Sequence, residues 1–237
     1  MKPLKVLIVG CGGVGSYLVP PLAKTLNYAS PGSTLILVDG DTISLENLDR
    51  QLFQEKDIGK FKTEALARNL RQHTKLKVEC ISKYASPLLE LPAVDMSIVA
   101  VDNHVARNFV LSYSDMNNSP MISGANEDKA AESFIYVPSL GWKDHEKLDP
   151  RKLFPNIETD LSDDPNHPEG CTGATALTNA PQTAEANFIA SALCVRMFGA
   201  WVLNTVAPEF IDYLPARFES NFSSITTVTV GQLRNSK

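Results

Sequence analysis

The sequence predicts an α/β fold with a doubly wound, mostly parallel sheet, followed by a C-terminal helix and antiparallel strands. A short apolar run at residues 5–9 leads directly into a glycine-rich turn and then into a segment with helical apolar spacing. Similar short runs alternate with helical segments as far as residue 137. This alternation predicts βαβ units, which build a parallel sheet with helices on its faces.

The predicted strands are short, rich in β-branched residues and bounded by polar residues or proline. They are expected at residues 5–9, 35–38, 77–81, 96–101, 121–124 and 133–137, with one or two more near 225–230. The predicted helices carry apolar residues at helical spacing and span residues 14–27, 60–72, 104–117 and 180–204. A turn is expected at residues 126–129, and residues 138–170, which are rich in Pro, Asp, His and Asn, predict a long irregular loop.

Composition and charge narrow the class of protein. The 237 residues are 43% hydrophobic and 21% charged, which predicts a globular protein with one sizeable core. The net charge of -5 argues against a general nucleic-acid or membrane-surface binder, because such proteins need a dense basic face. No apolar run approaches the length of a membrane span and the N-terminus has no signal-peptide pattern, so we expect a cytoplasmic location without membrane contact.

The four cysteines are widely spaced, which indicates neither a disulfide framework nor a zinc site. Cys11, Cys80 and Cys194 fall in the glycine turn, a strand and an apolar helix, and we expect them to be small packed residues. Cys171 differs because it follows Gly170 in a polar segment before the last long helix. A thiol there is expected to be more exposed, and a helix N-terminus would lower its pKa.

The glycine-rich turn is the first candidate binding feature. Gly10, Gly12, Gly13 and Gly15 form a Gly-x-Gly-x-x-Gly spacing between the first strand and the first helix. Glycine permits a tight turn and lets backbone N–H groups approach anionic oxygens, so the turn predicts a nucleotide-binding, Rossmann-like unit. By itself the turn does not distinguish ATP from a redox dinucleotide.

Charged residues after the turn favour ATP. Asp39 lies 24 residues after Gly15, at the expected carboxyl end of the second strand, where an acid commonly accepts hydrogen bonds from a ribose. NAD and ATP both offer that ribose, and Asp39 could instead cap the next turn. Arg50 and Lys62, taken singly, would be solvated surface charges. Placed together with Asp39, they suit a triphosphate.

Asp102 is the candidate metal ligand. With Asn103 it follows strand 96–101, at the edge where open α/β sheets place ligand-facing residues. Either side chain could cap helix 104–117, and Asn103 is the better placed of the two. Asp102 is then available to hold Mg²⁺ beside phosphates, since Mg²⁺ prefers oxygen donors.

In combination these motifs resemble those of the ThiF/MoeB/E1 superfamily, whose members adenylate the C-terminal glycine of ubiquitin-like and sulfur-carrier proteins. The segments that carry the resemblance are GCGGVGSY, LVDGDTISLENLDRQLF, IGKFK and AVDNHVAR, in this order and spacing. It covers residues 4–137 clearly and 168–206 weakly. It implies a single E1-like adenylation domain over residues 1–237, with a nucleotide-binding core at 1–137 and a crossover loop, long helix and terminal strands at 138–237.

The resemblance also implies roles for individual residues. The four glycines, Asp39 and Asp41 would bind ATP, with Asp39 on the ribose. Asn47, Arg50 and Lys62 would contact the phosphates, and Arg50 and Lys62 would act in catalysis. Asp102 would hold Mg²⁺, and Arg107 would be structural. Cys171 matches a cysteine that in this family takes the acyl group as a thioester or assists sulfur transfer.

The sequence departs from the family pattern in places. Relatives usually carry an N-terminal helix whose arginine reaches the triphosphate of a partner subunit, yet only about three residues precede the first strand, so that arginine is expected to come from elsewhere or be missing. The paired CxxC zinc motifs are absent, and no zinc is expected. These reductions are similar to the ThiF-type proteins of the plasmid-associated PRTRC gene system. The apolar helix 180–204 makes a homodimer an expectation as well.

The leading hypothesis is ATP-dependent adenylation of the C-terminal carboxylate of a ubiquitin-like or sulfur-carrier protein with a glycine tail, followed by transfer to Cys171 or directly to a nucleophile. One alternative is a non-catalytic nucleotide-binding partner subunit, which would hold ATP without turnover. The other is an NAD(P)-dependent oxidoreductase using the same turn. That reading leaves Arg50, Lys62 and Asp102 without a role, and NADH binding without ATP binding would favour it.

Overall fold

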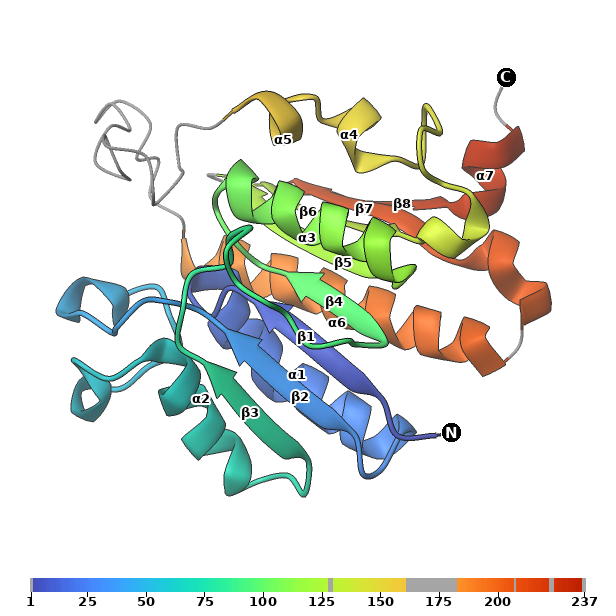
Figure 1. Ribbon diagram of the computed structural model, residues 1–237. Coiled ribbons are helices and arrows are strands. Elements are labelled where there is room, and N and C mark those ends of the chain that lie inside the picture. The colour runs from blue at the N-terminus through green and yellow to red at the C-terminus, as the bar shows by residue number, and fades with distance from the viewer. Residues whose placement is uncertain (1, 128–129, 161–182, 207, 222–223, 236–237) are drawn as a thin grey trace.

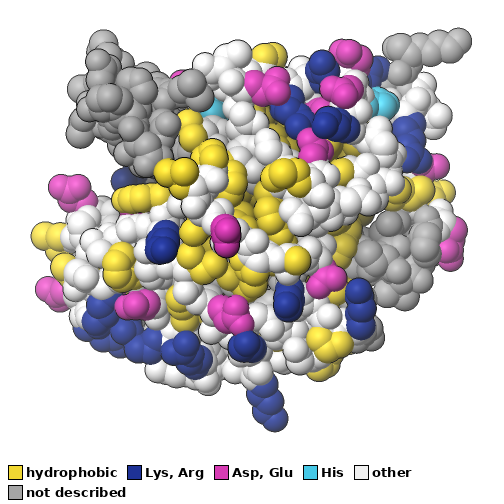
Figure 2. Space-filling view, viewed as in Figure 1, with side chains coloured by type: hydrophobic (Ala, Val, Ile, Leu, Met, Phe, Trp, Pro, Cys, Tyr) yellow, Lys and Arg dark blue, Asp and Glu magenta, His cyan; other side chains and the backbone are white. Residues whose placement is uncertain are grey.

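The computed structural model describes residues 2–127, 130–160, 183–206, 208–221 and 224–235 (Figure 1 and Figure 2). Their strands form one eight-stranded sheet in the order β3-β2-β1-β4-β5-β6-β7-β8. The strands are β1 (Lys5–Val9), β2 (Thr34–Val38), β3 (Lys77–Ile81), β4 (Met96–Val99), β5 (Met121–Glu127), β6 (Ala130–Tyr136), β7 (Pro215–Asn221) and β8 (Ser224–Thr229). The longer helices are α1 (Gly13–Ala29), α2 (Lys62–Arg71), α3 (His104–Asn117) and α6 (Ala184–Val206).

The first five strands are parallel and set the position of the site. In the register, Val9 at the end of β1 pairs with Val38 in β2 and with Val99 in β4, so the carboxyl ends of these strands lie level. The chain passes from β1 outward to β2 and β3, then returns to β4 on the other side of β1. The strand order therefore reverses between β1 and β4, and a crevice opens there above the sheet.

Helices cover both faces of the parallel strands. In Figure 1, α1 and α2 lie on one face and α3 on the other, as right-handed crossovers in opposite directions require, and α6 packs beside α1. Four of the five residues of β1, and four of the five of β2, are buried. Burial on both faces explains why these strands read as continuous apolar runs rather than as an alternation. The predicted α/β class with a doubly wound sheet is confirmed.

The second half of the chain extends the sheet with antiparallel strands. β6 pairs with β5, β7 with β6, and β8 with β7. The predicted terminal strands are therefore present, but a short helix that was not predicted, α7 (Val230–Asn235), follows them. The turn predicted at residues 126–129 is placed differently, since β5 continues to Glu127, and residues 128–129 lie outside the described part of the chain.

The irregular loop predicted at 138–170 is confirmed only in part over its described residues, 138–160, because short helices interrupt it. Residues 138–160 contain the 3-10 turn η3 (Pro138–Leu140) and two short helices, α4 (Pro150–Leu153) and α5 (Asn156–Thr159). Helix α4 begins with an Asp-Pro pair, in which the Asp149 side chain accepts a hydrogen bond from the Arg151 N–H and Pro150 occupies the first helical position. Both are ordinary helix-start signals, which a four-residue helix without apolar periodicity hides.

The long apolar helix begins at Ala184 rather than at residue 180 and ends at Val206. It packs against α1 and against the strands β5 and β6, so its apolar residues meet partners in several directions. Within the described residues, no helix combines the length and the apolarity needed to cross a membrane.

A charged cluster fixes the segment after β6 to the rest of the fold. The Arg151 guanidinium donates to Asp149 Oδ1 at 2.9 Å, to Asp115 Oδ2 at 2.7 Å and to the Tyr136 hydroxyl at 2.9 Å. Its side chain is 12% exposed, and that of Asp149 is 1% exposed. Burial works to raise the pKa of Asp149, but hydrogen bonds from Arg151 and from the Asp144 N–H lower it overall, so the acid stays charged. One arginine therefore joins α3, β6 and α4.

We expect Arg151→Met to lower the free energy of unfolding by about 3–5 kcal/mol, because it leaves the Asp149 charge buried without its partner. Urea unfolding followed by circular dichroism measures the change. Arg196→Met, which alters an exposed arginine on α6, should change stability by less than about 0.5 kcal/mol. Equal stability of the two variants would show that the cluster does not hold the segment.

Candidate nucleotide-binding site

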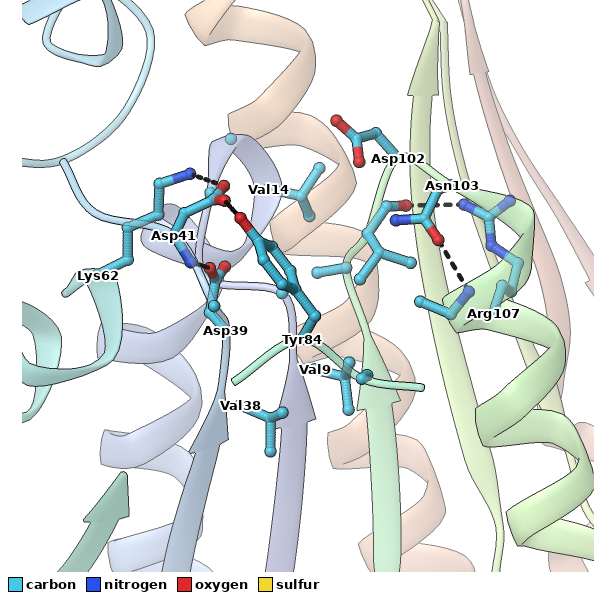
Figure 3. A pocket seen from close by; sticks show the side chains of 18 of the residues that line it. Val9, Val14, Val38, Asp39, Asp41, Lys62, Tyr84, Asp102, Asn103 and Arg107 are labelled. Atoms are coloured by element: carbon cyan, nitrogen blue, oxygen red, sulfur yellow. Dashed lines mark hydrogen bonds and ion pairs between the residues drawn. The ribbon is translucent and has the colours of Figure 1, made fainter. Parts of the chain in front are cut away.

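A cavity of about 580 Å³ lies at the carboxyl ends of β1, β2 and β4, where the strand order reverses. The glycine turn forms one wall, and residues that follow β2, β3 and β4 form the others. Figure 3 shows Asp39, Asp41, Lys62 and Tyr84 gathered on one side and Asp102 on the other. The volume is within the roughly 300–1,000 Å³ range of small-molecule sites.

Two close approaches between backbone segments determine the shape of the glycine turn. Gly10 has a φ of +93°, and a Cβ on it would lie 2.4 Å from the carbonyl oxygen of Ala100 at the end of β4. A Cβ on Gly15 would lie 2.0 Å from the Gly10 carbonyl oxygen. Gly10, Gly12 and Gly13 line the cavity, whereas Gly15 lies outside its lining. The structure therefore shows Gly15 in the packing of α1 against the turn.

The first turn of α1 faces the cavity with its backbone amides uncapped. Helix α1 begins at Gly13, and its N-cap, Gly12, has no side chain with which to make a capping hydrogen bond. The first N–H groups of a helix have no intrahelical partner, and the helix dipole places partial positive charge there. This arrangement suits an anionic group such as a phosphate.

Asp39 is engaged in building the turn. Its Oδ2 accepts a hydrogen bond from the Cys11 N–H at 2.6 Å, and its Oδ1 accepts one from the Asp41 N–H at 2.8 Å. Burial raises the pKa of Asp39, while the charge of Lys62 and these two hydrogen bonds oppose the rise. The carboxylate lines the cavity, so it links the end of β2 to the glycine turn in addition to facing a ligand.

Lys62 is buried beside the glycine turn. It is the first residue of α2 and only 6% exposed, and its Nζ donates to Asp41 Oδ2 at 2.6 Å. A Cβ on Gly12 would lie 3.7 Å from that Nζ, which places the ammonium group close to the start of α1. Burial works to raise the pKa of Asp41, but hydrogen bonds from Lys62 and Tyr84 and the charge of Lys62 lower it overall.

Arg50 lies in the segment that follows the 3-10 turn η1 (Leu45–Asn47) and lines the cavity. Its backbone carbonyl accepts a hydrogen bond from Asn187 Nδ2 on α6 at 3.1 Å. Its guanidinium makes no hydrogen bond or ion pair with the described residues. Asn47 also lines the cavity, and its Oδ1 accepts from the Ser44 N–H at 3.1 Å, which shapes the turn before Arg50.

Asn103 has the helix-capping role that the sequence predicts, while the magnesium role of Asp102 stays a prediction. The Asn103 side chain caps α3 by accepting a hydrogen bond from the Ala106 N–H at 2.8 Å. Asp102 is exposed and lines the cavity. Arg107 donates to the Val101 carbonyl oxygen at 2.9 Å, which ties α3 to the end of β4, and burial lowers the pKa of Arg107.

Sequence reasoning missed several cavity residues. Tyr84 follows β3 at the same edge of the sheet, and Gln51 and Asn126 also line the cavity. Asn187 is fully buried, and its amide group lies against Gly13, where a Cβ would be 2.6 Å from Oδ1. The rule that ligands lie at carboxyl strand ends could have found Tyr84. No local signal marks Asn187, which is 137 residues from its hydrogen-bond partner Arg50.

The three cysteines that the structure describes pack in the fold, as the sequence predicts. Cys11 and Cys194 are fully buried, and Cys80 is partly buried against the core. Burial raises the pKa of the Cys11 thiol well above its usual value, with a further contribution from Asp39, so this thiol stays protonated although it lies in the glycine turn. Cys171 lies outside the described residues.

One crevice of this doubly wound α/β sheet thus contains an uncapped helix start, a buried lysine, an exposed carboxylate and an arginine without a partner among the described residues, which makes it a candidate phosphate-binding site. A family model of the ThiF family matches residues 1–205. The chain therefore belongs to the ThiF family. The family inferred from the sequence motifs is confirmed.

Named relatives match parts of the chain. It is 34% identical over 130 residues, 53% of its length, to the adenylyltransferase and sulfurtransferase MOCS3 of Caenorhabditis briggsae, and covers 31% of that protein. It is 42% identical over 73 residues, 30% of its length, to the NEDD8-activating enzyme E1 catalytic subunit of Caenorhabditis elegans, and covers 16% of it. The chain thus spans about a third or less of the length of these relatives.

A solved structure matches nearly the whole chain. The crystal structure of E. coli MccB with ATP superimposes with a TM-score of 0.67 and 26% sequence identity, covering 96% of this chain and 64% of the MccB chain. The structure of PaaA, at 20% identity and a TM-score of 0.65, shows the same fold.

The donor set fits a nucleotide with a divalent cation. Among the described residues, no three His, Cys, Asp or Glu side chains are grouped so that they could hold a metal ion by themselves. Mg²⁺ is usually bound by one or two carboxylates together with substrate phosphates and water. Asp102 would supply the carboxylate, and Arg50, Lys62 and the start of α1 would face the phosphates.

We expect Gly15→Ala to destabilise the protein by about 1–3 kcal/mol or more, because the added methyl group overlaps the Gly10 carbonyl oxygen and forces α1 away from β1. Thermal unfolding measures the effect. The matched control is Gly199→Ala on α6, where a Cβ meets no atom within 4 Å among those described, and helix propensity predicts a gain of roughly 0.5–1 kcal/mol. A Gly15→Ala protein as stable as the wild type would contradict the packing described above.

Proposed function

We propose that this chain binds Mg·ATP and uses it to adenylate the C-terminal carboxylate of a partner protein. The observation that carries the proposal is the convergence of Lys62, Arg50 and the uncapped N-terminus of α1 on one cavity, with Asp102 at its other side. Three sources of positive charge suit a triphosphate, and a separate exposed carboxylate suits its magnesium ion. The ATP-bound relative MccB and the adenylyltransferases among the relatives support ATP as the nucleotide.

In the proposed reaction, a carboxylate oxygen of the partner's tail attacks the α-phosphorus of ATP. The bond from the α-phosphorus to the bridging oxygen breaks, and that oxygen leaves with pyrophosphate, giving an acyl-adenylate. Negative charge moves onto the departing group, and Arg50 and Lys62 would stabilise it. The bound Mg²⁺ would neutralise phosphate charge. Asp39 would hold the ribose, Asp41 would hold Lys62 in place, and Asn47 would shape the turn that presents Arg50.

A ubiquitin-like or sulfur-carrier protein with a glycine tail is the substrate class that we propose. The relatives named as a sulfurtransferase and as a NEDD8-activating enzyme support this class. Transfer of the acyl group to Cys171, a homodimer and a cytoplasmic location belong to the same proposal. Cys171 would receive the acyl carbon as a thioester while AMP leaves.

ATP–pyrophosphate exchange in the presence of the partner tests the reaction. We expect Asp102→Ala and Arg50→Ala to slow exchange at least a hundredfold, about 2.7 kcal/mol of lost transition-state stabilisation, while the fold stays intact. Asp49→Ala and Lys24→Ala remove exposed charges outside the cavity lining and should change the rate less than about twofold. Exchange that is unchanged in either cavity variant would contradict the assigned roles.

Binding alone separates this function from the dehydrogenase alternative. We expect calorimetric titration to show micromolar binding of ATP with Mg²⁺, and loss of the Mg²⁺ dependence in Asp102→Ala, because that carboxylate would be the ligand of the ion. NADH titrated under the same conditions should bind at least tenfold more weakly. Binding of NADH without ATP would place the protein with the oxidoreductases, and bound ATP that never exchanges with any carboxylate tail would indicate a non-catalytic subunit.

A further inference from the structure

Tyr84 is the one Phe, Tyr or Trp side chain in the lining of the nucleotide cavity, as far as the structure describes it. It lies on the segment that leaves the carboxyl end of β3, and its neighbours Ala85 and Ser86 are both 8% exposed and anchor that segment. Tyr84 itself is 53% exposed. In Figure 3 its ring extends between the acids that follow β2 and the residues that follow β4. Tyr84 is therefore held in the lining of the cavity, with part of its side chain exposed.

The Tyr84 hydroxyl is joined to Lys62 through a single carboxylate. It donates a hydrogen bond to Asp41 Oδ1 at 2.7 Å, and Lys62 Nζ donates to Asp41 Oδ2 at 2.6 Å. Both oxygens of Asp41 are thus engaged, although its side chain is 44% exposed. A lysine ammonium group has three N–H donors, so the bond to Asp41 leaves two for other acceptors.

Gly40 explains why the ring can take this position. A Cβ on Gly40 would lie 2.7 to 2.8 Å from the Cγ, Cδ1 and Cδ2 atoms of Tyr84, closer than packed carbon atoms approach. The ring therefore covers the backbone between Asp39 and Asp41 directly. The glycine of the Asp-Gly-Asp sequence has no positive φ, so its absent side chain provides room for Tyr84.

We propose that Tyr84 is a positioning residue for phosphate binding: its hydroxyl fixes Asp41, and Asp41 holds the Lys62 ammonium group beside the glycine turn. A lysine side chain has a flexible four-carbon stem, and holding it before the ligand arrives reduces the entropy lost on binding. Groups that meet a phosphate need such support from residues behind them. The inference rests on the proposed function, because it assigns Lys62 to the phosphates of the nucleotide.

The test is a double-mutant cycle on ATP affinity, using Tyr84→Phe, Lys62→Met and the double variant. Tyr84→Phe keeps the ring and removes only the hydroxyl. We expect it to weaken ATP binding roughly five- to tenfold, as for loss of a hydrogen bond to a charged group. In the Lys62→Met background the same change should alter ATP affinity less than about twofold, because the group it positions is gone.

Adenosine distinguishes positioning of Lys62 from direct contact with the nucleoside. Since adenosine has no phosphate, its affinity should be the same within about twofold in wild type and in Tyr84→Phe. Tyr28→Phe removes a hydroxyl from a tyrosine that is 90% exposed and outside the cavity lining, and it should leave ATP affinity unchanged. Equal losses of ATP affinity in both Lys62 backgrounds, equal losses for adenosine and ATP, or no loss in Tyr84→Phe would each overturn the proposal.

The test of the Tyr84 role can succeed or fail independently of the adenylation proposal. A wild-type protein that binds ATP but never exchanges pyrophosphate would defeat the proposed reaction, while the binding cycle would still decide the role of Tyr84. A protein that exchanges pyrophosphate normally with Tyr84→Phe in place would retain its function and defeat only the positioning role. Absence of ATP binding in the wild type would overturn both.

Discussion

The site depends on two close approaches between backbone segments in the glycine turn. Because neither Gly10 nor Gly15 has a side chain, α1 can start directly above the end of β1 and beside Ala100 at the end of β4. The first amides of α1 then face the crevice where the strand order reverses. The charged residues of the site line the same cavity, and uncapped helix amides of this kind suit an anionic group.

The acids of the site have different surroundings, although they lie at one edge of the sheet. Asp39 accepts two backbone hydrogen bonds and holds the turn, and Asp41 accepts from Lys62 and Tyr84. Asp102 is exposed, while its neighbour Asn103 takes the capping role. All three acids line the cavity, but the two that follow β2 already accept hydrogen bonds from the protein itself. Under the proposed function this division favours phosphate binding, since acids compensated within the protein repel an anion less.

The second half of the chain supports the site from behind. Asn187 on α6 packs against Gly13 and holds the Arg50 carbonyl, so the long helix supports both the glycine turn and the segment that carries a cation. Arg151 fixes the segment after β6 to α3, the helix that begins beside Asp102. The sheet, α6 and α3 thus form a continuous support around the cavity. A binding site built on rigid elements in this way holds its groups more precisely than one built on loops.

The sequence by itself determined the order of the strands and long helices and the charged residues that line the crevice, but not the uncharged Tyr84, Gln51 and Asn126. β1, β3 and α3 have their predicted bounds, because buried strands leave short apolar runs and amphipathic helices leave periodic patterns in the sequence. The short helices after β6 escaped prediction, since four residues are too few to carry a period. Only the tertiary structure decided that Asp39 builds the turn, that Asn187 supports Arg50 and that Tyr84 reaches Lys62 through Asp41. These partners lie from 21 to 137 positions apart, and no local pattern records a contact that only the packing of the sheet and its helices creates.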